Sequence, residues 1–122
     1  MADSRPEAAG EFCAVLDAMR LLQAKWTLQI VRALLVGPRG FNDLARAVGG
    51  CNPATLSRRL ESLAEQGVVS KRVESTMPPR TSYTLTESGA ALVDVVAAIE
   101  RWGERYLPRP ERPVRRTRRE MR

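Results

Sequence analysis

The stretch "CNPATLSRRLESLAEQG", from Cys51 to Gly67, predicts a helix with two unlike faces. Asn52 can cap the N-terminus of this helix, and Pro53 fits its first turn, where no amide donor is needed. Gly67 can adopt the left-handed conformation that ends a helix. We therefore expect the helix to cover about residues 52–66. Its leucines recur with the helical period and form one buried stripe: Leu56, Leu60 and Leu63.

Three more helices are predicted before this one. Residues 12–23 place apolar side chains on one face of a helix, namely Phe12, Val15, Leu16, Met19 and Leu22. The segment "KWTLQIVRALLV", Lys25 to Val36, is apolar almost all round, which predicts a helix at the centre of the core, and "GPRG" at 37–40 ends it. The run "FNDLARAV" then predicts a short helix over residues 41–48.

A β-hairpin and a long helix are predicted after Gly67. The β-branched runs "VVSKRVE" and "TSYTL" are typical of strands, and the "STMPPR" between them predicts a loop whose prolines stay out of the ladder. Thr86 and Glu87 then begin a last helix of about residues 86–107. An apolar stripe follows this helix at helical spacing: Leu92, Val95, Val96, Ile99, Trp102 and Tyr106.

This order of elements predicts the fold class. Helices joined by the short "GGCN" and followed at once by a hairpin are typical of a winged helix-turn-helix, a mainly α fold with a small β-hairpin. In such a fold the second helix of the pair enters the DNA major groove, and the hairpin loop reaches the neighbouring backbone or the minor groove. The helix over residues 52–66 is then expected to be the recognition helix.

The outward face of that helix carries the residues expected to contact DNA. Arg58 lies opposite the leucine stripe, one turn after the small Ala54 and Thr55, so its guanidinium can pair bidentately with guanine. Arg59 lies on the flank and suits a phosphate. The full set of candidate DNA-binding residues on the helix and hairpin is Asn52, Ala54, Thr55, Ser57, Arg58, Arg59, Lys71, Arg72 and Arg80.

Two alternatives apply to the same face. Paired arginines on a helix are often only a solvated surface. A winged helix can also bind protein, but such an interaction module would more often expose Leu, Phe or Trp than the small and basic residues found here.

The composition excludes most enzyme classes. The chain has 122 residues, 43% of them hydrophobic, which suits one globular domain. It has two cysteines and no histidine, which excludes Ser-His and Cys-His nucleophilic sites and a structural zinc site. The glycine-rich phosphate-binding motifs are also missing from the sequence. We expect a protein that is not an enzyme and uses no metal or other cofactor.

The ends of the chain differ from its centre. Residues 1–11 are expected to be a flexible lead-in, residues 12–107 the folded domain, and residues 108–122 a disordered basic tail. The tail has seven Arg and two Glu, so most of the net charge of +6 lies there, where it either favours a polyanion or only solubilises the protein. No stretch resembles a signal peptide or a membrane span, which predicts a cytoplasmic protein with no membrane partner.

Residues 12–107 resemble the HxlR family of bacterial winged-helix transcription regulators. The resemblance rests on the cysteine about a dozen residues before "KW", on "GPRGFNDL", on "LSRRLESL", on "PPRTSYTLTESG" and on "WG" near the end. It implies a homodimer, formed largely by the N- and C-terminal helices, that binds a pseudo-palindromic operator near its own or neighbouring genes. It also implies that some members sense oxidants or electrophiles through cysteine, and Cys13 stands at the position usual for that residue.

The residues themselves also favour a dimer. Packing the first and last helices across a two-fold axis would bury both apolar faces and place two recognition helices roughly 34 Å apart. A last helix folded back on its own domain is the alternative.

The two cysteines are candidate redox-sensing residues. Cys51 lies just outside a helix N-terminus, whose dipole can stabilise a thiolate. One interpretation is a bridge from Cys13 of one subunit to Cys51 of the other. The alternatives are modification of Cys13 alone by a small-molecule oxidant or electrophile, or two thiols that only pack. A ligand-responsive regulator without redox chemistry is a further possibility, in which Trp26, Trp102 and Tyr106 line a pocket.

Overall fold

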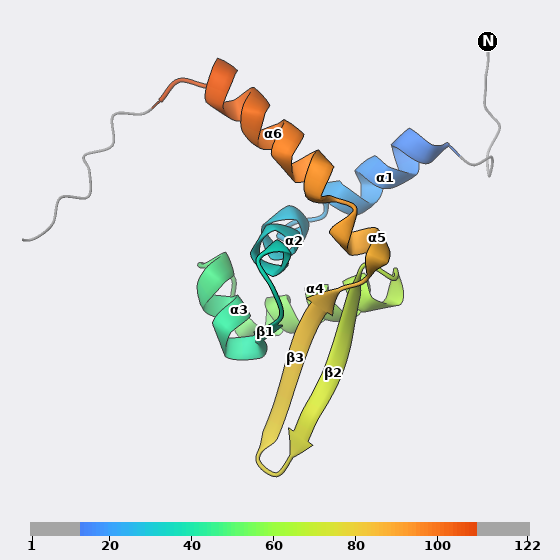
Figure 1. Ribbon diagram of the computed structural model, residues 1–122, viewed down its shortest axis with the longest axis vertical. Helices are drawn as coiled ribbons and strands as arrows, with labels where there is room; N and C mark the ends of the chain where they lie inside the picture. Colours follow the sequence, from blue (N-terminus) through green and yellow to red (C-terminus); the bar gives the residue numbers. More distant parts are fainter. Residues whose placement is uncertain (1–12, 110–122) are drawn as a thin grey trace, which may run out of the picture.

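The computed structural model describes residues 13–109 (Figure 1). The expected lead-in, Phe12 and residues 110–122 of the basic tail lie outside the described residues. The elements are α1 (Ala14–Gln23), α2 (Thr27–Leu35), β1 (Arg39–Gly40), α3 (Phe41–Val48), α4 (Pro53–Glu65), β2 (Val69–Thr76), β3 (Pro79–Leu85), α5 (Glu87–Ala90) and α6 (Val93–Tyr106). The predicted winged helix-turn-helix is confirmed, with α3 and α4 as the helix pair and β2 and β3 as the wing.

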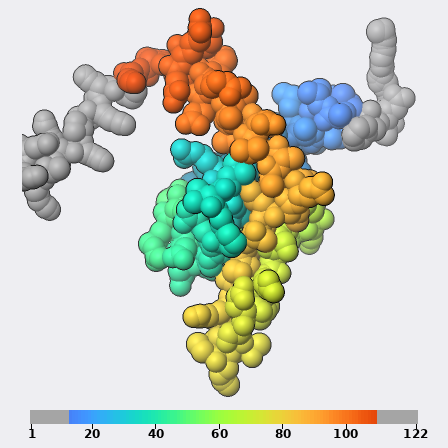
Figure 2. Space-filling view, in the orientation of Figure 1, coloured from blue at the N-terminus to red at the C-terminus, as the bar shows by residue number. Residues whose placement is uncertain are grey.

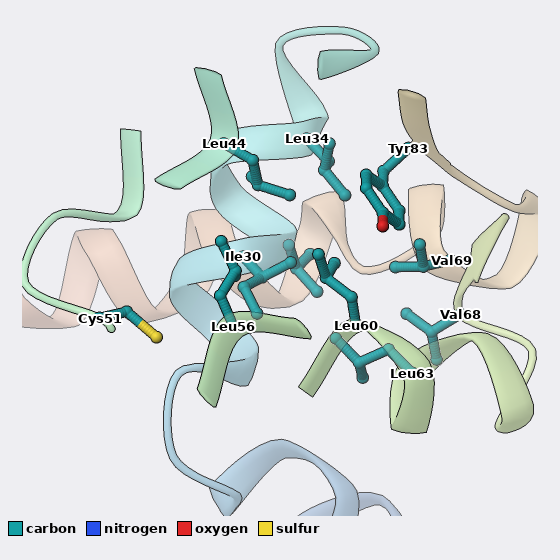
Figure 3. Close-up of a cluster of buried hydrophobic side chains, with 11 residues drawn as sticks. Ile30, Leu34, Leu44, Cys51, Leu56, Leu60, Leu63, Val68, Val69 and Tyr83 are labelled. Atoms are coloured by element: carbon teal, nitrogen blue, oxygen red, sulfur yellow. The ribbon is translucent and has the colours of Figure 1, made fainter. Parts of the chain in front are cut away.

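Helix α2 lies at the centre of the core, as its nearly uniform apolar sequence predicts. Its buried residues are Thr27, Ile30, Val31 and Leu34. The three apolar residues of this set meet the leucine stripe of α4, and Val68, Val69 and Tyr83 complete the cluster from the wing side (Figure 3). The predicted stripe of Leu56, Leu60 and Leu63 is therefore confirmed as the buried face of α4.

The ends of α4 form as the sequence predicts. The Asn52 side chain accepts a hydrogen bond from the backbone N–H of Thr55, at 3.0 Å. At the other end Gly67 has φ of +80°, and the N–H of Val68 donates to the carbonyl oxygen of Leu63. Local signals therefore fix the two ends of α4.

Helix α2 begins two residues later than predicted. Trp26 precedes it with φ of +74°, a left-handed conformation in which the chain turns from α1 into α2. The Lys25 ammonium lies 5.3 Å from the centroid of the Trp26 ring. The ring also lies against the turn between α3 and α4, since a Cβ added at Gly50 would be 3.8 Å from it.

The sheet has three strands in the order β1-β3-β2, so the predicted hairpin is only part of it. Strand β1 pairs Arg39 with Tyr83, and Arg39 also donates from Nε to the carbonyl oxygen of Ala33. The predicted loop 75–80 is too long, because Pro79 pairs with Thr76 and leaves only two residues at the tip. Pro79 is tolerated there as the first residue of its strand.

The predicted helix over residues 86–107 is interrupted. Thr86 caps α5 as expected, accepting from the N–H of Gly89, but the chain turns at Ala91 and Leu92 before α6 begins. The Thr86 and Ser88 hydroxyls both donate to the carbonyl oxygen of Gly67. These bonds hold α5 on the turn after α4, while Leu92 packs against the core and α6 extends away from it (Figure 1). None of the helices described is long and apolar enough to span a bilayer.

Candidate nucleic-acid interface

The N-terminal half of α4 presents small and polar side chains to solvent. Asn52, Ala54, Ser57 and Arg58 are exposed, and Thr55 is half-buried. The Asn52 Oδ1 atom is occupied by the cap, which leaves its amide Nδ2 as a donor. The side chains around Arg58 are therefore small enough for another molecule to approach the helix backbone closely.

The two adjacent arginines of α4 differ in their surroundings. Arg58 is exposed and forms no ion pair within residues 13–109. Arg59 is half-buried, and its Nε is enclosed without a hydrogen-bond partner among the described residues. An enclosed guanidinium N–H without an acceptor is unfavourable. Arg58 is therefore more accessible to another molecule than Arg59 is. The sequence predicted that Arg59 lies on the flank of the helix, but not that its Nε is enclosed.

The wing supplies the remaining cationic candidates. Lys71 and Arg72 lie on β2 and Arg80 lies on β3, and all three are exposed. Arg72 is near a carboxylate, since its Nε lies 4.0 Å from Oε2 of Glu74. Arg80 pairs in register with Ser75, which places it next to the tip of the hairpin.

Sequence reasoning missed a groove between α4 and the wing. Its cavity has a volume of about 340 Å³ and is lined by Ser57, Glu61, Glu65, Lys71 and Tyr83, among others. Burial raises the pKa of the Tyr83 phenol, and the negative charge of Glu61 raises it further, so the ring stays neutral. The two carboxylates make this groove a poor place for a polyanion. The spacing of Glu61 and Glu65, four residues apart on one side of α4, is the signal that could have located it.

The two cysteines lie in different environments. Cys13 is the exposed residue directly before α1. Cys51 is only 8% exposed and lies at the edge of the buried cluster, apart from its leucines (Figure 3). Its Sγ contacts the carbonyl oxygen of Asn52 at 3.7 Å. The position of Cys51 before a helix N-terminus predicts a reactive thiol, but in the folded domain this thiol is largely covered.

Two helices leave apolar faces uncovered. Neither α1 nor α6 has a buried residue. The exposed apolar side chains are Val15, Leu16 and Met19 on α1 and Val93, Val95, Ile99, Trp102 and Tyr106 on α6. The rings of Trp102 and Tyr106 lie 5.7 Å apart on the outside of α6. Trp26, in contrast, is half-buried and lies beside the turn between α3 and α4.

Comparison with known proteins places the chain among helix-turn-helix regulators. The sequence model described as HxlR-like helix-turn-helix matches residues 21–111. An uncharacterized HTH-type transcriptional regulator of Mycobacterium tuberculosis, Rv3095, is 43% identical over 96 residues, which cover 79% of this chain and 60% of the relative. The aligned part of the chain thus spans less than two thirds of that relative's length.

Two solved structures are similar in fold and sequence. The reduced form of the transcriptional regulator YodB from Bacillus subtilis superposes with a TM-score of 0.69 at 28% identity, covering 80% of this chain and 96% of YodB. The redox regulator HypR in its oxidized form superposes with a TM-score of 0.71 at 27% identity, covering 80% of this chain and all of HypR. The structural neighbours are therefore winged-helix regulators.

Proposed function

Because the chain belongs to the HxlR-like helix-turn-helix family, we propose that it is a homodimeric, sequence-specific DNA-binding regulator that represses transcription. The observation that carries this proposal is the outward face of α4, where the exposed Arg58 stands among small side chains opposite the buried leucine stripe. A face of this kind fits the major groove, since small residues permit close approach and a guanidinium reads guanine.

The basic residues of the wing support the same partner. Lys71, Arg72 and Arg80 are exposed on β2 and β3, with Lys71 nearest the base of the hairpin. The hairpin itself extends well beyond the body of the domain (Figure 2). Phosphate contacts from such residues position a protein on the duplex without reading its sequence. A surface built to bind protein would instead expose large apolar side chains on α4, and the residues found there are small or charged.

The expected result for Arg58→Ala is a loss of about 1–3 kcal/mol on the preferred site, with weaker discrimination at the base it reads. Arg80→Ala and Arg59→Ala should weaken all sequences alike and lower the salt dependence of binding, because phosphate contacts carry no base information. Fluorescence anisotropy on a preferred duplex and on singly mismatched duplexes, at several salt concentrations, separates the two patterns. Unchanged discrimination in Arg58→Ala would make that residue an ordinary surface charge.

A second candidate function is redox sensing through the two cysteines, with an oxidant or electrophile as the signal. It is favoured by the exposed Cys13 at the start of α1 and by the similarity to HypR, which is described as a redox regulator. Two thiols would lose two electrons and two protons to the oxidant, for example diamide, which becomes the hydrazine, and would form one disulfide. Cys51 precedes α4 directly, so a bond to it would act on the recognition helix.

The burial of Cys51 gives this second function a testable consequence. A covered thiol must be uncovered by local opening before it can attack, so Cys13 should react first. We expect diamide to produce a covalent dimer in the wild type that is absent in both Cys13→Ser and Cys51→Ser, with a change in DNA affinity. Non-reducing gels and gel shifts of reduced and oxidised protein provide the measurement. Binding that is indifferent to oxidant in all three proteins would leave both cysteines as packing residues.

A further inference from the structure

The tip of the wing carries an apolar side chain that the domain does not use. Residues Met77 and Pro78 form the two-residue turn between β2 and β3. Met77 is 81% exposed, although its side chain is apolar. The hairpin projects from the body, so no other described element covers the tip (Figure 2).

The hairpin below the tip is built to approach a polyanion. Arg80 lies next to the turn, and Arg72 lies farther down β2. The acidic residue of β2, Glu74, already has partners on the hairpin, since its Oε2 accepts a hydrogen bond of 2.8 Å from Ser82 and lies 4.0 Å from Nε of Arg72. From Ser75 to Arg80 the segment contains no acidic residue. The charge pattern therefore leads a negatively charged partner to the tip.

The tip is held in a defined position. The backbone N–H of Met77 donates to Oγ of Ser75 at 3.2 Å, and Thr76 pairs in register with Pro79. The rings of Pro78 and Pro79 fix two consecutive φ angles. A β-bulge lies between Val73 and Ser75, and a bulge increases the local twist of a hairpin. Met77 is thus presented at the end of a stiff, twisted arm.

We propose that Met77 enters the minor groove of DNA as an apolar wedge that opens a base step and bends the duplex. This inference rests on the proposed DNA-binding function and assigns the wing a role beyond its phosphate contacts. Methionine and proline are among the residues that act as wedges in minor grooves, where cationic neighbours hold the phosphates on either side. Met77 therefore favours sites with a flexible pyrimidine–purine step under the wing.

The test compares variants of the same size but different polarity. Duplexes are first selected from a random-sequence pool by the wild-type protein, and their bending is followed by energy transfer between dyes at the two ends. We expect Met77→Leu to bind and bend like the wild type. Met77→Gln should lose about tenfold in affinity and most of the bend, because an apolar contact is lost. The salt dependence of binding should be unchanged, because the substitution removes no ion pair.

Val73→Thr is the matched control, because Val73 is also an exposed apolar residue of the hairpin but lies below the tip. It should leave the bend unchanged. A straight duplex in the wild-type complex, or equal bending by Met77→Gln and the wild type, would overturn the wedge while leaving DNA binding in place. A wild-type protein that enriches no duplex from the pool would overturn the proposed function itself, and the wedge with it.

Discussion

Gly89→Ala is expected to lower the free energy of unfolding by about 3 kcal/mol, the upper end of the usual cost of overpacking. A Cβ at position 89 would lie 2.2 Å from the backbone oxygen of Val68 and 3.0 Å from Cδ2 of Leu85. The oxygen cannot rotate away as the end of a flexible side chain can. The Val68 oxygen also accepts a hydrogen bond from the backbone N–H of Thr86, the residue before α5. A shift of α5 away from Val68 would therefore break this hydrogen bond.

Urea denaturation at a fixed protein concentration measures this effect. Gly103→Ala is the matched control, because a Cβ there would meet only Cδ1 of Leu107, at an ordinary 3.7 Å. Gly103 lies inside α6, where alanine is a better helix former, so this variant should be neutral or up to about 1 kcal/mol more stable. Equal unfolding midpoints for the two variants would show that α5 has room to move.

The close approach at Gly89 illustrates what sequence reasoning could not predict here. The cap, the leucine stripe and the terminal glycine of α4 lie within one short segment, so the sequence predicts that helix correctly. The role of Gly89 depends on a carbonyl of Val68, far away in the chain. Strand β1 has two residues and exists only because it pairs with β3, so it carries no periodic signal. The break before α6 likewise results from tertiary contacts of α5.

In the candidate interface, too, local sequence patterns predict some features, whereas others depend on tertiary contacts. The helical period correctly turns Arg58 outward, because the buried leucines fix the rotation of α4. The burial of Cys51 depends on the cluster that several elements build together, and neither this burial nor the enclosure of the Arg59 Nε is indicated by a local pattern. The wing loop is shorter than predicted, because proline can begin a strand at a position where no N–H is needed.

Ile99→Glu is expected to convert the proposed dimer into monomers and, as a result, to abolish tight binding to a palindromic site. Ile99 is 51% exposed in the middle of the uncovered apolar face of α6. At an interface related by a two-fold axis every substitution occurs twice, so two carboxylates would lose their hydration without gaining a partner. The dimer dissociation constant should rise by at least about 100-fold.

Sedimentation velocity measures this change directly, and binding to a full palindrome and to a single half-site measures its consequence for DNA. A monomer reads one half-site, so Ile99→Glu should lose affinity for the palindrome but keep its affinity for the half-site. Arg101→Glu is the control, since Arg101 is exposed on the same helix. This substitution changes the charge of the chain by more than Ile99→Glu does. If charge alone weakened assembly, the control would have the larger effect. If instead Ile99→Glu remained a dimer, the apolar face of α6 would not be the interface, and the two recognition helices would have to be brought one DNA turn apart by other surfaces.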